Sequence, residues 1–494
     1  MTGQPVEIDK ELFADSGLPT WMHPVLVNIG PDLDLMGDCW DGLRGVEAQY
    51  LPQEVKEPNP AYEVRLSRST YVPSFRKAIE AMAGIFSQFS VSDISSSLEE
   101  SLDDIDKTGN SLTAFLAQAD SLALRDGGCC VMVEMPQEVV IESEAERRVL
   151  NRRPYLVLIK RENVLNWKTE YIAGQEVLAQ ATVVEWREVD DGGFGFTVEP
   201  YFRVLRPGSF EVWKINNSPG AVQKLVMVEE GLSSIEDVPL VWYSPQPQRW
   251  GHGMPPFREL CLLTLQHYRS RSDLAELLHR CSLPVPVRKG ALLGAEGGTP
   301  PPLIIGPNSV VDCPIDGDFS FAEPAGTSLE QQQKQLAHIE ELINKETLAF
   351  MSNSSDAMTA TQARLQAGQV QSGLTLAAMQ KASLFEQIQW LWSEYMSEEP
   401  IGTLEVSAQA LEQKLGSDQV AQIQSLADGG YISKNSTLEL LQRGGVLPMD
   451  FDIEEETQEM EANESAALDK RLARDQELMR GGVMMPPGQF AAES

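Results

Sequence analysis

The sequence predicts a multidomain α+β fold, and three observations support this prediction. The chain has 494 residues, of which 42% are hydrophobic, and this is enough for roughly two to four domains with buried cores. Between Arg153 and about Ser244, short runs rich in Val, Tyr, Phe and Trp alternate with Gly, Asp, Asn and Ser-Pro turns, which indicates a sheet. On both sides of this β-rich third, apolar residues recur at helical spacing.

The region before the sheet is predicted to hold an extended arm and then helices. Residues 1 to about 60 are acidic and rich in Pro, Gly and Trp without a sustained hydrophobic period, so we expect an arm with short turns. Residues 62–86 predict two helices separated at Pro73, and a polar acidic loop follows them. Asn110 is expected to cap a helix that ends at Gly127, and a strand is expected from Cys129.

After the sheet, the sequence predicts two long helices joined by a small insertion. Residues 251–253, Gly-His-Gly, are typical of a flexible joint. The first helix is expected over residues 256–283, with Leu274 and Leu278 among its apolar positions, and Pro284 ends it. The second helix is expected over 327–350, where two overlapping capping boxes mark its start. Residues 284–326 between them carry short strands and Gly/Pro turns.

Residues 351–361 are expected to interrupt this helical region. Their Ser and Asn side chains compete for backbone hydrogen bonds, which favours a short polar loop over a helix interior. A helix is then predicted to resume and to be followed by two short helices around Gly429-Gly430. An acidic block and a low-complexity tail end the sequence.

The charge and composition exclude several broad classes of function. The chain carries 39 Lys and Arg against 73 Asp and Glu, a formal net charge of −34, which argues against a general nucleic-acid binder because phosphate neutralisation needs clustered cations. No run approaches the roughly 18–20 apolar residues of a membrane helix, and the N-terminus lacks the features of a signal peptide. We therefore expect a soluble protein made in the cytoplasm, whose six cysteines are reduced and buried.

The motifs of common enzymes are missing from the sequence. It has no glycine-rich nucleotide or phosphate loop, no zinc-protease motif and no nucleophile elbow. The five histidines are scattered, and His267 and His279 lie more than three helical turns apart, so we expect surface or interface roles for them. Cys129 and Cys130 should point to opposite faces of a strand, which argues against a redox pair.

Two charged groups leave alternatives open. The acidic run of Asp32, Asp34, Asp38 and Asp41 suggests cation binding only loosely, because the spacing of a calcium loop is absent. From Arg258 to Lys289 there are six Lys or Arg and three acids. These cations are either solvated helix charges or a basic belt that faces another subunit or DNA.

Several segments together resemble the portal proteins of tailed bacteriophages, specifically a portal-like family described as a domain of unknown function. The resemblance lies in the order of five segments and covers roughly residues 60–465. The segments are Tyr62-x-x-Arg65 with residues 70–86, then residues 124–136, 153–167, 254–287 and 428–456.

This resemblance implies a ring of about twelve subunits with the portal fold of wing, stem, clip and crown. The N-terminal acidic arm would occupy 1–60, and the wing 61–255 and, as a return helix and strand, 362–410. The stem helices would be 256–283 and 327–350, the clip 284–326 and the tunnel loop 351–361. The crown and tail would occupy 411–494, although the short tail after residue 465, which ends in Gly and Pro, does not support a long helical crown barrel.

The resemblance also implies a function and a set of sites. The ring would form the DNA channel at the unique capsid vertex of the virion, assembled in the host cytoplasm, without catalysis, cofactor, metal or membrane. Its partners would be double-stranded DNA, the terminase large subunit, head-to-tail adaptor proteins, and major capsid and scaffolding proteins. The implied channel residues are Asn353, Ser354, Ser355, Asp356 and Thr359; the stem contacts to DNA or to another subunit are Arg269, Arg271 and Arg280; the clip docking surface holds Arg288, Lys289, Asp316 and Asp318.

Two other functions remain as alternatives. One is another ring or scaffold component of a virus particle, which would lack a continuous axial channel. The other is a metal-dependent nuclease that uses the carboxylates of Asp32, Asp34 and Asp38.

Overall fold

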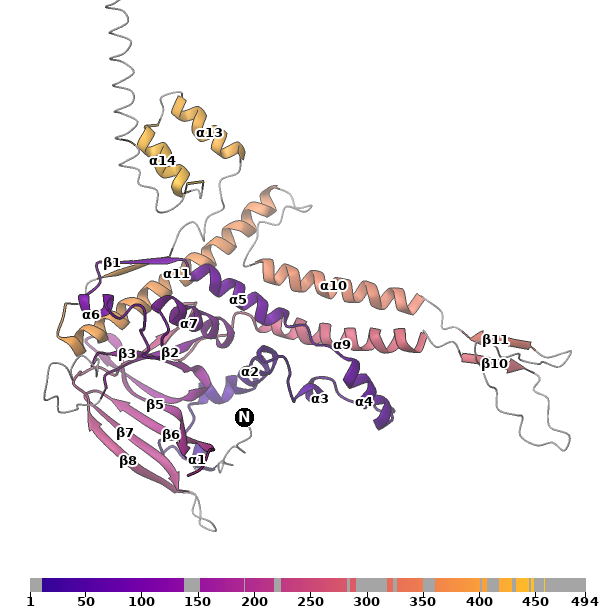
Figure 1. Cartoon of the computed structure of the whole chain (residues 1–494), viewed down its shortest axis with the longest axis horizontal. Helices are drawn as coiled ribbons and strands as arrows, with labels where there is room; N and C mark the ends of the chain where they lie inside the picture. The colour runs from indigo at the N-terminus through magenta and orange to yellow at the C-terminus, as the bar shows by residue number, and fades with distance from the viewer. Residues whose placement is uncertain are drawn as a thin grey trace, which may run out of the picture. The chain divides into compact units, whose positions relative to one another are not determined.

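A computed structural model of the chain shows a mixed α/β protein (Figure 1). Contacts divide the chain into two units, residues 1–406 and 407–494. The structure describes residues 11–136, 152–190, 192–216, 224–281, 285–289, 318–322, 327–349, 360–399, 402–406, 417–428, 432–443, 446, 447 and 457.

Two antiparallel sheets form the β-rich part of the first unit. A three-stranded sheet has the order β3-β2-β9, and a five-stranded meander has the order β4-β5-β6-β7-β8. Strands therefore occupy the region between Arg153 and Ser244, as the sequence predicts. Their bounds are β2 Cys129–Glu134, β3 Tyr155–Lys160, β4 Val164–Ile172, β5 Gln175–Asp190, β6 Phe196–Arg206, β7 Ser209–Asn216, β8 Lys224–Leu232 and β9 Leu240–Tyr243.

Strand β2 separates two hydrophobic cores. Cys129, Val131 and Val133 belong to a core with helices α7 (Leu112–Asp126) and α11 (Ala360–Met396), and with the two-stranded sheet of β1 (Phe89–Ser92) and β12 (Thr403–Val406). Cys130 and Met132 belong to the other core, against the five-stranded sheet. The two thiols therefore lie on opposite faces, as side-chain alternation along a strand requires.

The N-terminal region is helical and packed, so the prediction of an extended arm is wrong over residues 24–50. Helix α2 (Pro24–Trp40) buries Leu26, Ile29, Leu33 and Met36, and short helices α1 (Glu11–Ala14) and α3 (Glu47–Tyr50) flank it. Helices α4 (Asn59–Arg68) and α5 (Ser74–Phe86) follow, and they are separated at Pro73 as predicted. The apolar spacing of α2 outweighs Pro31 inside it.

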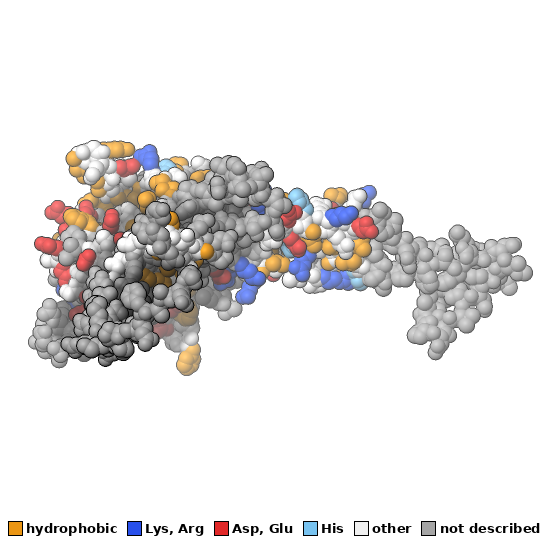
Figure 2. Space-filling model, turned by 90° about the horizontal axis from the view of Figure 1, so that it is seen from above, with side chains coloured by type: hydrophobic (Ala, Val, Ile, Leu, Met, Phe, Trp, Pro, Cys, Tyr) orange, Lys and Arg blue, Asp and Glu red, His pale blue; other side chains and the backbone are white. Residues whose placement is uncertain are grey.

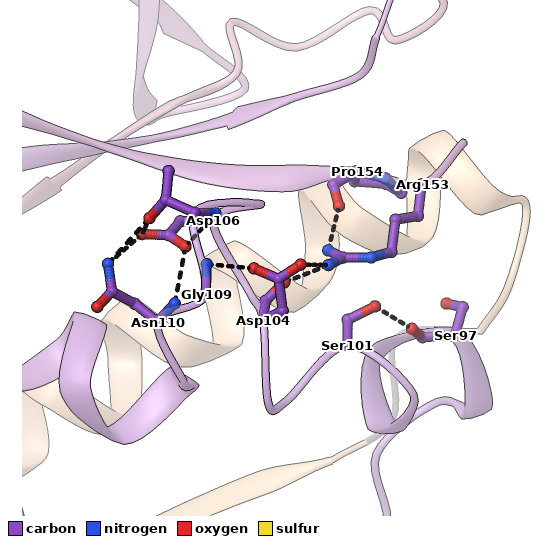
Figure 3. Close-up of polar contacts among 9 residues, drawn as sticks. Ser97, Ser101, Asp104, Asp106, Gly109, Asn110, Arg153 and Pro154 are labelled. Carbon is purple, nitrogen blue, oxygen red and sulfur yellow. Dashed lines mark hydrogen bonds and ion pairs between the residues drawn. The ribbon is translucent and has the colours of Figure 1, made fainter. Parts of the chain in front are cut away.

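The segment before α7 is ordered by its own polar contacts (Figure 3). It contains the short helix α6 (Ser96–Glu99), and Leu98 and Ile105 are buried, so it is more than the expected polar loop. Ser111, and not Asn110, is the N-cap of α7: its Oγ accepts from Ala114 N at 3.3 Å.

Asn110 instead closes the preceding turn. Its Nδ2 donates to Asp106 Oδ2 at 2.7 Å. The neighbouring Asp104 accepts from Gly109 N at 2.7 Å and from the Arg153 guanidinium at 3.0 Å (Figure 3). Asp104 and Asp106 are therefore used within the fold, and Asp104 is bound by an arginine from another segment.

The second unit is described over two short helices, α13 (Ser417–Asp428) and α14 (Lys434–Arg443). They lie on either side of Gly429-Gly430, as predicted. In the described part of the chain, we find no helix with the length and apolarity that a membrane crossing requires.

Candidate functional site

The candidate functional site consists of two long helices and a pair of short strands that lies between them in the sequence. Helix α9 (Arg258–Cys281) lies beside α10 (Thr327–Ala349) (Figure 1). Strands β10 (Val285–Lys289) and β11 (Asp318–Ala322) pair antiparallel, with Val285 opposite Ala322. Because β10 follows α9 and β11 precedes α10, the strand pair connects the same end of both helices.

The packing between α9 and α10 is largely apolar. Leu274 of α9 and Ile339 and Ile343 of α10 are buried. His267 is also buried, and its Nε2 lies 3.2 Å from Glu340 Oε1, so the expectation of a surface position is wrong for this histidine. Leu278, another apolar position of α9, is 42% exposed in the single chain.

Some of the cations of α9, which the sequence leaves as either solvated charges or a basic belt, are used inside the chain. Arg258 forms an ion pair with Asp32 at 2.9 Å, and Arg269 Nε donates to the Tyr50 carbonyl at 2.9 Å. Arg271 is exposed and forms no ion pair with the residues that the structure describes. The side chain of Arg280 lies outside the described residues. Figure 2 shows Lys and Arg interspersed with Asp and Glu along the part that holds the helix pair, and a further group of Asp and Glu at the left of the view.

Helix α9 is held from a second side by the N-terminal region. Ser69 Oγ donates to Ser272 Oγ at 2.7 Å, and the rings of Tyr71 and Tyr268 meet edge to face at 5.9 Å. The thiols of Cys39 on α2 and Cys261 on α9 are both buried, and their interaction lowers the pKa of Cys39 and raises that of Cys261. We call residues 24–71 the N-terminal buttress, because they support α9 within the same chain.

The joint before α9 is rigidly packed, so the prediction of flexibility at residues 251–253 is wrong. The Arg161 guanidinium is buried and donates to the carbonyls of Asp126 (2.7 Å), Gly253 (2.6 Å) and Gly251 (3.1 Å). Burial lowers the pKa of Arg161 to about 10, which leaves it charged at neutral pH. A Cβ on Gly253 would overlap the Gly127 carbonyl oxygen, so the two backbones cross in direct contact.

A buried ion pair fixes α11 to the core. Lys381 Nζ donates to Asp120 Oδ2 and to the Phe86 carbonyl, each at 2.7 Å, and lies 4.6 Å from the Phe89 ring centroid. Tyr243 OH donates to Asp120 Oδ1 at 2.5 Å. Burial raises the pKa of Asp120 and lowers that of Lys381, while their mutual attraction opposes both shifts.

Two histidines that are distant in sequence meet beside α2. His23 stacks on Trp167 at 3.9 Å between centroids, and the ring of His252 lies 6.2 Å from His23. His23 Nδ1 accepts from Val25 N at 3.2 Å and so caps α2. Burial and the neighbouring His252 lower the pKa of His23, which favours the neutral ring that this cap requires.

The three carboxylates of the nuclease alternative do not form a metal site. Asp32 pairs with Arg258, and Asp38 accepts from Tyr50 OH at 2.6 Å. Burial and then the charges of Asp38 and Glu162 raise the pKa of Asp34. Over the described ranges, no three or more His, Cys, Asp or Glu side chains are grouped to hold a metal ion.

Several implied site residues fall outside what the structure describes. The proposed channel residues of 351–361 are described only from Ala360, where α11 begins, so Asn353, Ser354, Ser355, Asp356 and Thr359 lie outside the described residues. Asp316 also lies outside them. Arg288 and Lys289 are on β10 and Asp318 is on β11, and only their backbones are described.

Comparison with solved structures finds distant similarity to chains of a gene transfer agent (GTA) particle. One, described as the virion of the native particle, is 12% identical and covers 82% of this chain and 98% of its own, with a TM-score of 0.38. A chain from the neck of the empty particle, computed with C6 symmetry, is 12% identical and covers 79% and 95%, with a TM-score of 0.41. A chain from the native neck, computed with C12 symmetry, is 11% identical and covers 81% and 98%, with a TM-score of 0.39.

Comparison with curated proteins finds no match to the chain. Comparison with protein families finds one that matches part of the sequence. A family described as "Domain of unknown function (DUF4055)" matches residues 256–396. This range begins just before α9 and ends with α11, so it contains the whole candidate site. Over residues 256–396, the match confirms the expected resemblance to a domain-of-unknown-function family.

Proposed function

We propose that the chain is the subunit of a ring-shaped portal, a structural component of a phage-type virion through which double-stranded DNA is packaged and ejected. This proposal is carried by the order of elements in the chain: helix α9, a strand pair and helix α10. Residues 350–359 then lead into helix α11, which the Lys381–Asp120 ion pair fixes to the core. In this proposal α9 and α10 are the stem, residues 284–326 the clip and residues 351–361 the tunnel loop.

The rest of the proposed division follows the sequence-based expectation, with one change. Residues 61–255 and 362–410 are the wing, and 411–494 are the crown region and tail. Residues 24–50 are no longer part of an arm in this scheme, because α2 and α3 belong to the buttress of α9. A stem supported by its own chain suits a conduit, since the wall must keep its shape while DNA moves through it.

The charge of the chain supports the same role. A net charge of −34 disfavours tight binding to phosphates, and tight binding would slow the passage of a duplex. The in-chain contacts of Arg258 and Arg269 remove two of the cations that could act as such a brake. Polar side chains of the tunnel loop, such as Asn353 and Ser354, would offer exchangeable hydrogen bonds to phosphates.

We further propose the terminase large subunit and head-to-tail adaptors as partners of the clip, and capsid and scaffolding proteins as partners of the wing. The strand pair at one end of the helix pair is a suitable docking element, because it can be approached without disturbing the stem.

The test of this function is a packaging assay with assembled particles. Deleting residues 351–361 should leave rings intact and reduce the amount of DNA packaged per particle. The matched control deletes part of the low-complexity tail, residues 481–494, which should leave packaging unchanged. Wild-type amounts of packaged DNA in the loop deletion would refute the proposed channel role, whereas loss of rings would show that the loop is needed for assembly.

A further inference from the structure

Helix α9 presents two different surfaces on its opposite sides. Arg271 and Asp273 are two residues apart, so their side chains leave the helix about 200° apart and only about 3 Å apart along its axis. Leu278, seven residues after Arg271, returns to within about 20° of it. An exposed arginine and a 42% exposed leucine therefore share one side of α9.

The other side of α9 forms the floor of a groove. This groove has a volume of about 680 Å³ and lies between the loop of residues 54–58, α9 and α10. Its walls hold four carboxylates and two cations. The carboxylates are those of Glu54, Glu57, Asp273 and Glu276, and the cations are Lys56 and Arg65.

The arginine of the groove already donates hydrogen bonds within its own chain. Arg65 donates from two nitrogens to Glu57, both at 2.8 Å, and donates to the Pro52 carbonyl at 2.9 Å. No described residue donates a hydrogen bond to Asp273, and burial, together with Glu54 and Glu57, raises the pKa of its carboxyl against the opposing effect of Arg65. Glu276 forms an ion pair with Arg68 at 3.8 Å, so the four carboxylates of the groove face three cations and an excess of one negative charge remains.

A side-chain oxygen from α10 in this groove, like the Asp273 carboxylate, accepts no hydrogen bond from the described residues. Gln332 lines the groove, and its Oε1 is buried without a hydrogen-bond partner among the described residues. A buried acceptor without a donor is costly, so a donor from outside the chain would be stabilising there. At the rim, Val55 is 98% exposed and offers an apolar surface to the methylene groups of a long side chain.

We propose that, in the ring, Arg271 of one copy inserts into this groove of the next copy and donates to Asp273 and Gln332. This inference rests on the proposed portal function, since a ring is built by a heterologous contact in which two different surfaces of one chain meet. Rotation about a ring axis keeps each residue at its height. With the stem roughly along that axis, two surfaces only about 3 Å apart along α9 meet at the required level.

Arginine suits this groove better than lysine would. The guanidinium presents five N–H donors in a planar fork, so it can serve a carboxylate and an amide oxygen at once. The exposed Leu278 lies on the same side as Arg271, and burial against the next copy would remove it from water. The groove on one copy and the Arg271 side on the next are thus complementary in charge and in apolar surface.

Charge reversal with rescue tests the contact. Arg271→Glu places a carboxylate against the acidic groove, and we expect it to raise the protein concentration needed for ring assembly by at least about tenfold. Lys345→Glu, an equal charge change at an exposed position of α10, is the matched control and should change that concentration little. The Arg271→Glu, Asp273→Arg double variant restores opposite charges across every contact and should recover most of the loss.

A crosslink gives a second, independent readout. Arg271→Cys with Asp273→Cys places the two thiols on opposite sides of one helix, so a short bismaleimide can join them only between copies. We expect a ladder at multiples of 54.6 kDa in denaturing gels, absent from the wild type with its own six cysteines.

The outcomes separate this inference from the function on which it rests. Wild-type rings with normal assembly of Arg271→Glu and no ladder would overturn the Arg271 contact and leave the portal proposal standing. A wild-type protein that forms no rings under any condition, including with scaffolding protein, would overturn both.

Discussion

Replacement of Lys381 by methionine probes the ion pair that anchors α11 to the core. Lys381 and Asp120 are 0% and 1% exposed at the side chain, and the two charges lie 2.7 Å apart. The range of about 0–1 kcal/mol for solvent-exposed pairs therefore does not apply. Methionine keeps the length of the side chain, so the substitution removes the charge with little change in packed volume.

The expected loss of stability follows from the carboxylate that remains. Lys381→Met leaves Asp120 buried without its cation, a change that costs about 3–5 kcal/mol of unfolding free energy. Tyr243 still donates to Asp120, so we expect a value near the lower end of this range. Urea unfolding at a fixed protein concentration, followed by tryptophan fluorescence, measures the difference, since Trp392 lies in the same core.

The loss should depend on pH in a defined direction. Without Lys381, the already raised pKa of Asp120 rises further, so the folded variant binds a proton that the unfolded chain releases. Its stability then falls as pH rises above the pKa of an unfolded aspartate, about 3.9, and the deficit against the wild type is larger at pH 7 than at pH 4.5.

Two controls decide the interpretation. Lys345→Met, at an exposed position of α10, should change stability by less than about 0.5 kcal/mol. The double variant with Asp120→Asn removes both charges and should be more stable than Lys381→Met alone. A loss below about 1 kcal/mol in Lys381→Met, or a double variant no better than the single, would refute the anchoring role.

Two further predictions concern the joint and the cap of α2. Gly253→Ala forces a Cβ against the Gly127 carbonyl and should lower the unfolding free energy by at least about 2 kcal/mol. The control Gly84→Ala, at a helical position with open space, should be neutral or stabilising by up to about 1 kcal/mol. Equal urea midpoints for the two variants would contradict the backbone crossing. The pKa of His23 is lowered in the folded state, so the stability that the neutral ring contributes is lost as pH falls below about 6.5, the ordinary pKa of histidine. His23→Asn keeps the cap on Val25 N and should flatten the profile of stability against pH between pH 7.5 and 5.5. An unchanged profile would refute this prediction.

Local patterns in the sequence predict much of the fold. The prolines at 256 and 284 bracket α9, alternation identifies the strands between Arg153 and Ser244, and Gly127 ends α7 with a positive φ of 77°. These features depend on neighbouring residues, so a single chain is enough to reveal them.

Features that depend on distant parts of the chain are not predictable in this way. The buttress was missed because Gly30, Pro31 and Gly37 obscure α2, although Leu26, Ile29, Leu33 and Met36 carry its helical spacing. That spacing was the signal that could have revealed the helix.

The partners of buried charges form a second group beyond the reach of local patterns. Lys381 and Asp120 are 261 residues apart, and nothing in either local sequence names the other. The burial of Arg161 and the meeting of His23 with His252 likewise follow from tertiary packing, which no period or spacing encodes. The exposure of Leu278 is likewise not predictable from the local sequence, because α9 has more apolar positions than its own chain buries.

The central claim, a closed ring with the helix pair around an axial channel, is tested most directly by light scattering of the purified full-length protein together with electron micrographs of the same sample. The account predicts particles of about 655 kDa, twelve times the 54.6 kDa chain, with a hole along the symmetry axis. A protein that stays at 54.6 kDa with and without scaffolding protein, or closed particles without an axial hole, would contradict it.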